Sequence, residues 1–63
     1  MISDNVNAYD YDSATGVLTL RFNDGSLYQY YGVPQSFADE FSYPHPWHRV
    51  HDRIKAYGYQ RVA

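Results

Sequence analysis

The C-terminal third of this 63-residue chain combines arginine, lysine and tyrosine, residue types that together can bind nucleic acid. Guanidinium and ammonium groups pair with phosphates, and a tyrosine ring stacks on an unpaired base. The candidate nucleic-acid-binding residues are Arg49, Arg53, Lys55, Tyr59 and Arg61. Trp47 and Tyr57 lie among them, but both fall on the apolar stripe of an expected helix. We therefore assign these two rings to the core, which leaves Tyr59 as the ring available for stacking.

The distribution of charge favours the same segment. Residues 1–40 contain six acidic residues and one basic residue, Arg21. Residues 41–63 contain one acidic residue, Asp52, and four basic residues. Such asymmetry is typical of a local anion-binding face, although ordinary surface charge can segregate in this way. The acidic half and the net charge of −2 predict weak binding confined to the basic face. RNA or another nucleic acid is the first expectation. A protein partner is the alternative, since tyrosine and arginine also favour protein interfaces.

Three histidines precede or interrupt this segment at a spacing of three. Imidazole is a ligand for zinc or nickel, and Asp52 follows His48 by four residues. However, His45 precedes a proline, and His48 and His51 would point about 60° apart on a helix. We expect surface histidines, with no metal site and no cofactor.

Nothing in the sequence predicts catalysis. None of the serines or threonines lies in a recognisable nucleophile motif, and no glycine-rich phosphate loop is present. The carboxylates are scattered, and a chain of this length has little interior in which to raise a carboxyl pKa. We expect no enzymatic activity, no catalytic residue and no small-molecule substrate.

A β-hairpin in the middle of the chain is the element that must position these side chains. Every second residue from Leu18 to Phe22 is apolar, which is the period of a half-buried strand. Asn23-Asp24-Gly25 then supplies a turn, and the tyrosine-rich residues 27–31 supply the second arm.

The length of the turn decides which face carries Tyr28 and Tyr30. A three-residue loop sets Phe22 opposite Ser26 and places both tyrosines on the core face with the apolar residues. A two-residue loop would instead place them beside Arg21 as an aromatic platform. The sequence Asn-Asp-Gly favours the first register, because it suits a type I turn followed by a glycine bulge.

The remaining elements complete an α+β fold. Residues 6–11 predict a first strand with Val6 and Ala8 on one face and Tyr9 and Tyr11 on the other. We expect a three-stranded antiparallel meander, with a short C-terminal strand over residues 59–62 as an optional fourth, and two short helices packed on one face. The whole chain, residues 1–63, forms a single domain.

Two apolar stripes define the expected helices. In the first, Ser36 and Asp39 have the spacing of a capping box, with an apolar stripe at residues 37, 38 and 41. The second runs from Pro46 to Gly58 and directs residues 47, 50, 54 and 57 to the sheet. In this helix Lys55 lies on the outer side.

Composition limits what else the chain can do. It has no cysteine, so neither disulfides nor thiolate ligands are available. Its longest apolar runs are only a few residues, and nothing resembles a signal peptide or a membrane span. We expect a soluble, cytoplasmic protein without a membrane partner.

Short motifs in this order resemble the KTSC domain, a small domain named after the C-terminus of some lysyl-tRNA synthetases. The resemblance spans residues 6–62 and implies a small α+β domain whose usual suggested partner is RNA. Such domains occur alone in small bacterial proteins and as appendages of synthetases. The motif positions with an implied structural role are Tyr28, Tyr30, Val33 and Pro34. The other positions that carry the resemblance are Tyr11-Asp12, Leu18, Leu20, Phe22, Gly25, Ile54-Lys55, Tyr57, Arg61 and Val62.

Residues 42–52 depart from the family pattern. This segment is longer, lacks the usual glycine and carries the three histidines. An activity tied to that family segment is therefore not implied for this chain by the resemblance. A bacteriophage or mobile-element variant adapted to a different partner would fit such a change.

Overall fold

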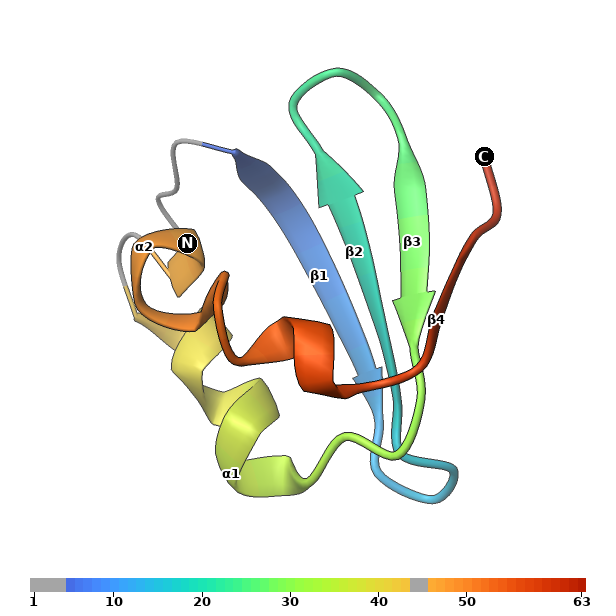
Figure 1. Ribbon diagram of the computed structural model, residues 1–63, viewed down its shortest axis with the longest axis vertical. Helices are drawn as coiled ribbons and strands as arrows, with labels where there is room; N and C mark the ends of the chain where they lie inside the picture. The colour runs from blue at the N-terminus through green and yellow to red at the C-terminus, as the bar shows by residue number, and fades with distance from the viewer. Residues whose placement is uncertain (1–4, 44–45) are drawn as a thin grey trace.

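A computed structural model describes residues 5–43 and 46–63, which form a four-stranded antiparallel sheet with short helices over one face (Figure 1). The strands follow one another in space in the order β1-β2-β3-β4. Their bounds are Val6–Asp12, Val17–Phe22, Leu27–Tyr30 and Tyr59–Arg61. The α+β class is confirmed. The sheet has four strands rather than three, because the optional C-terminal strand pairs with β3.

The central hairpin adopts the register with the three-residue turn. The Phe22 amide donates to the Ser26 carbonyl over 2.9 Å, and the Gly25 amide donates to the Phe22 carbonyl over 2.9 Å. Gly25 has φ of +91°, a conformation that glycine adopts at little cost. Leu20 consequently lies opposite Tyr28, so the tyrosines of β3 share the face of the apolar residues of β2. The expected register is confirmed.

A β-bulge at Asn7 changes the faces of β1. Val6 and Ala8 pair with adjacent residues of β2, rather than with residues two apart. One extra residue in β1 reverses the alternation beyond it. Val6 is therefore fully buried, yet Tyr9 and Tyr11 lie opposite core residues of β2 on the same face. The prediction that Val6 and the two tyrosines occupy opposite faces was wrong, because it assumed an unbroken period of two.

The first helical segment consists of α1 (Gln35–Ala38) and a 3₁₀ turn, η1 (Asp39–Ser42). Pro34 is the N-cap of α1, and no side chain caps that end. The expected capping box is wrong, since the helix begins before Ser36 and places that residue inside its first turn. Instead, Gln35 Nε2 donates to Asp39 Oδ1 over 2.9 Å. The apolar stripe is confirmed, and its buried members are Phe37, Ala38 and Phe41.

The second helical segment is shorter and broken. α2 (Pro46–Val50) ends eight residues before Gly58, and η2 (Ile54–Ala56) follows after a turn. The turn contains His51 and Asp52, which have low helix propensity. The stripe nevertheless reaches the sheet: Val50 and Ile54 are buried, and Trp47 and Tyr57 are half-buried against the core.

One end of the sheet is fastened by family-motif residues. The Tyr11 hydroxyl donates to the Val33 carbonyl over 2.5 Å, and the Val33 amide donates to the Gly16 carbonyl over 2.9 Å. Gly16 has φ of +72° in the turn between β1 and β2. Val33 is 2% exposed, whereas its neighbour Pro34 is exposed. These bonds join the β1–β2 turn to the segment that enters α1.

Candidate functional site

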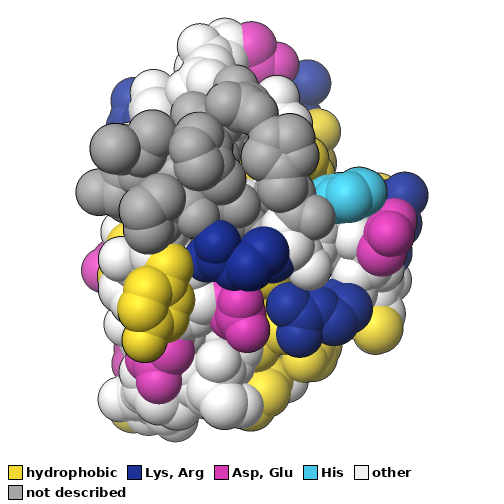
Figure 2. Space-filling view, turned by 90° about the vertical axis from the view of Figure 1, so that its left-hand side faces the viewer, with side chains coloured by type: hydrophobic (Ala, Val, Ile, Leu, Met, Phe, Trp, Pro, Cys, Tyr) yellow, Lys and Arg dark blue, Asp and Glu magenta, His cyan; other side chains and the backbone are white. Residues whose placement is uncertain are grey.

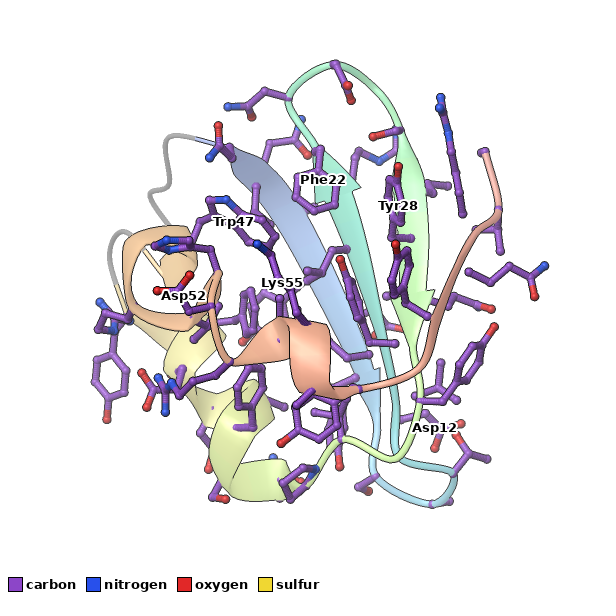
Figure 3. The ribbon with its side chains drawn as sticks, in the orientation of Figure 1. Asp12, Phe22, Tyr28, Trp47, Asp52 and Lys55 are labelled. Atoms are coloured by element: carbon purple, nitrogen blue, oxygen red, sulfur yellow. The ribbon has the colours of Figure 1, made fainter. Side chains whose placement is uncertain are left out.

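A cleft of about 550 Å³ opens between the β2–β4 part of the sheet and the segment from α2 to η2. We call it the aromatic cleft, because five rings contribute to its lining. They are Phe22, Tyr28, Tyr30, Trp47 and Tyr59. Figure 3 shows Trp47 on the helical side, Tyr28 on the sheet and Phe22 between them.

Phe22 connects the two walls of the aromatic cleft. Its ring lies edge-to-face with Trp47, at 5.1 Å between centroids and an interplanar angle of 88°. It makes the same kind of contact with Tyr28, at 5.4 Å and 87°. Edge-to-face pairs at these distances are mutually stabilising. The orientation of both walls is therefore fixed by one central ring.

Three tyrosine rings form a layer on the sheet side. Tyr28 stacks on Tyr30 at 6.5 Å, and Tyr59 of β4 packs against both at 6.0 and 5.5 Å. Tyr30 is 6% exposed, and burial, followed by the neighbouring phenols of Tyr59 and Tyr28, raises its pKa. Tyr59 is 60% exposed, as expected for a stacking ring. Tyr28 is half-buried rather than largely buried, because the broken helical segment leaves its side of the sheet open.

Lys55 lines the aromatic cleft. Its side chain rises from η2 toward the side of the cleft that holds Trp47 (Figure 3). The expected position on the outer side of a helix was wrong, because the break after Val50 interrupts the rotation of 100° per residue on which that position depended. Within the described part of the chain, Lys55 makes no ion pair.

Arg61 lies on the same face of the sheet. It pairs with Tyr28 in the β3–β4 ladder, and residues directly opposite each other share a face. Its Nε donates to the Ala63 carbonyl over 2.9 Å. Lys55 and Arg61 thus place two exposed cations near the exposed ring of Tyr59.

Asp24 lines the hairpin end of the aromatic cleft. Its Oδ1 accepts hydrogen bonds from the Ser26 amide over 2.9 Å and from the Ser26 hydroxyl over 2.7 Å. These two bonds hold the pKa of Asp24 below its usual range, and the positive charge of Arg61 lowers it slightly further. An exposed, ionised carboxylate therefore marks this end.

Arg49 and Arg53 lie together, as expected, but they form a separate cluster around Glu40. Arg49 Nε lies 3.1 Å from Glu40 Oε1 and Arg53 Nη2 lies 3.7 Å from Glu40 Oε2. Arg49 Nη2 also donates to the Glu40 carbonyl over 2.7 Å. On the face in Figure 2, basic side chains border an acidic one. Neither arginine lines the aromatic cleft, and the Glu40 carboxylate offsets part of their charge.

Aromatic rings complete this second cluster. The Arg53 guanidinium lies 5.5 Å from the centre of the Phe37 ring, and that of Arg49 lies 5.9 Å from the centre of the Tyr43 ring. These contacts join α2 and the following turn to α1 and η1. The arrangement serves the packing of the helical segments.

Of the three histidines, the structure describes the side chain of His51. His45 lies outside the described residues, and the side chain of His48 is not described. His51 Nδ1 is 3.0 Å from the Trp47 carbonyl oxygen, and its Nε2 is 3.4 Å from Asp52 Oδ1. In residues 5–43 and 46–63, no three His, Cys, Asp or Glu side chains are grouped to hold a metal ion.

The described helices are all too short to span a membrane.

Comparison with known families decides where the chain belongs. The family model of the KTSC domain matches residues 2–44, which is more than half of the chain. The chain belongs to the KTSC domain family. None of the curated proteins compared with it matches. The KTSC match ends before α2, so Trp47, Lys55 and Tyr59 contribute to the cleft from residues beyond it.

Sequence reasoning placed Tyr59 near the site but missed the cleft itself. Trp47 was assigned to the core because it lies on the apolar stripe, and Phe22 because it alternates with polar neighbours. Both assignments are half right, since the two rings pack on the core and also line open space. The sequence feature that could have indicated the cleft is the number of aromatic residues, twelve in all. Two short helices cannot bury that many rings against the sheet.

Proposed function

We propose that this KTSC protein is a non-enzymatic module that binds single-stranded RNA weakly through the face of its aromatic cleft. The observation that carries the proposal is the exposed ring of Tyr59, packed on Tyr28 and Tyr30 and accompanied by two cations, Lys55 and Arg61. An aromatic surface beside positive charge is suited to an unpaired base and its phosphates. A base within a duplex is already stacked, so single strands are preferred.

The contacts of Glu40 revise which cations meet the phosphates. From the sequence alone, about three or four phosphates and a log–log salt slope near −2 to −3 are expected. Because Arg49 and Arg53 are partly neutralised by Glu40, Lys55 and Arg61 remain as the principal phosphate contacts. Two phosphates on a single strand correspond to a slope of about −1.4, with a dissociation constant on the order of micromolar or weaker.

Fluorescence anisotropy of a labelled RNA oligonucleotide, titrated with protein between low and moderate salt, tests the proposal. Lys55→Gln and Arg61→Gln should each reduce the slope by about 0.7. Arg21→Gln is the matched control, because Arg21 is exposed on the opposite face of β2 and carries the same charge. It should leave the slope unchanged.

Two results would overturn the proposal. One is the absence of RNA or DNA binding at low salt up to high micromolar protein. The other is an equal loss of slope in Arg21→Gln, which would indicate attraction by general charge. Capture of a protein that survives nuclease treatment and high salt would instead support the alternative, a protein-binding module.

A further inference from the structure

We infer that the aromatic cleft binds one unpaired nucleobase that carries an exocyclic amino group, with a phosphate of the same strand at Lys55 and the amino group at Asp24. This inference rests on the proposed function and specifies the ligand of the same site. Cytosine, adenine and guanine carry such a group, whereas uracil does not.

The lining of the cleft favours a flat, aromatic occupant. Its volume of about 550 Å³ lies within the usual range of small-ligand sites, and half of its lining residues are the five rings and Ile54. The ring of Phe22 is nearly perpendicular to both Trp47 and Tyr28, and these two rings lie on opposite sides of it (Figure 3). A base has a π-face on each side, so it gains from contact with either wall.

The charges of the cleft differ between its two ends. The hairpin turn, which carries Asp24, lies at one end of β2 and β3, while η2, which carries Lys55, crosses the sheet further along (Figure 1). Both side chains line the cleft. A ligand that matches this pair has an anionic group at one end and a hydrogen-bond donor at the other. An amino-bearing nucleotide has both.

The carboxylate of Asp24 is fixed as an acceptor. Ser26 engages its Oδ1 through two hydrogen bonds, and neither of these bonds uses Oδ2. The same two bonds lower the pKa of Asp24, which keeps the group ionised at neutral pH. An ionised carboxylate accepts from an amino group but opposes the carbonyl oxygen that uracil presents at the same position.

Trp47 reports on the cleft directly, because it is the only tryptophan of the chain. We would titrate the protein with short oligonucleotides of cytidine, adenosine or uridine and follow both Trp47 fluorescence and anisotropy of a labelled end. Cytidine and adenosine oligomers should quench Trp47 and bind more tightly than uridine by roughly tenfold or more, as for a hydrogen bond to a charged group. Lys55→Gln should weaken all three equally.

Asp24→Asn is the decisive variant. Asparagine keeps the size of the side chain and can still accept from Ser26, but it offers an amide donor to the O4 atom of uracil. The preference against uridine should therefore disappear or reverse. A Ser13→Ala variant, in the exposed turn at the other end of the sheet, is the control and should leave the preference unchanged.

The outcomes separate this inference from the proposed function. RNA binding by anisotropy without any change in Trp47 fluorescence would overturn the inference and leave the proposed function standing. Equal quenching by all three oligomers would overturn the role of Asp24. No binding of any oligomer would overturn both.

Discussion

Removal of the Tyr11 hydroxyl tests whether the family-motif residues fasten the sheet. Tyr11→Phe keeps the ring, which packs against the core, and deletes only the donor to the Val33 carbonyl. The matched control is Tyr31→Phe, which deletes a hydroxyl whose partner is Gln29 Oε1 at 3.3 Å on the exposed side of the same sheet. The two variants change the same atom in different surroundings.

The expected magnitudes follow from those surroundings. Val33 is 2% exposed, so water has little access to its carbonyl once the hydroxyl is gone. An acceptor left in this state costs about 1–3 kcal/mol, and we expect Tyr11→Phe to lower the free energy of unfolding by about 1–2 kcal/mol. Tyr31 is 39% exposed, so water replaces its partner and the change should stay within about 0.5 kcal/mol.

Urea denaturation and thermal melting measure both variants. For a domain of this size, about 1 kcal/mol corresponds to a shift of about 4–8 °C in Tm, so Tyr11→Phe should melt visibly earlier. The urea dependence of the free energy should stay the same, because the exposed surface of the unfolded chain hardly changes. Equal Tm values for Tyr11→Phe and Tyr31→Phe would refute the structural role of this hydrogen bond.

Three further predictions concern glycine conformation and pH. Gly16→Ala should cost about 1–2 kcal/mol in urea denaturation because Gly16 has φ of +72°, whereas Gly58→Ala, with open space around the added methyl group, should cost less. The hydrogen bonds from Ser26 lower the pKa of Asp24 in the folded state, so their stabilisation is present above the usual aspartate range and is lost as the pH falls through the lowered pKa. Asp24→Asn should therefore flatten the acid limb of a plot of stability against pH, and an unchanged limb would contradict this. The raised pKa of Tyr30 has the opposite consequence. Its contribution to stability is intact below about pH 10 and is lost as the pH rises through the raised pKa. Tyr30→Phe should reduce this loss of stability in an alkaline titration.

The hairpin was predictable because its determinants are local. Asn23-Asp24-Gly25 specifies the turn, the turn specifies the register, and the register places Tyr28 and Tyr30 on the core face. The apolar stripes of both helical segments were predictable for a similar reason, since spacing alone identifies residues such as Phe41 and Val50 that face the core.

The bulge and the helix break were not predictable from the spacing of apolar residues, because both interrupt the regular period on which that reasoning depends. An extra residue at Asn7 is stabilised only once Val6 and the following tyrosines have a common core to fill. The end of α2 at Val50 is followed by His51 and Asp52, whose low helix propensity is too weak a signal to locate a break. The expected positions of two site residues differ from the observed ones. Lys55 was expected on the outer side of a helix but lines the cleft. Arg49 forms an ion pair with Glu40, a residue for which the sequence suggested no role.

The bulge in β1 also bears on how copies of this protein meet one another. β1 is an edge of the sheet, and an exposed edge offers backbone groups to any strand that arrives. The irregular spacing at Asn7 disrupts a regular ladder, and Asp10 and Asp12 place negative charge along the remainder of the strand. Two such edges repel and fit poorly, so the extra residue that turns Tyr9 and Tyr11 to the face of Val6 also disfavours pairing of two copies through β1.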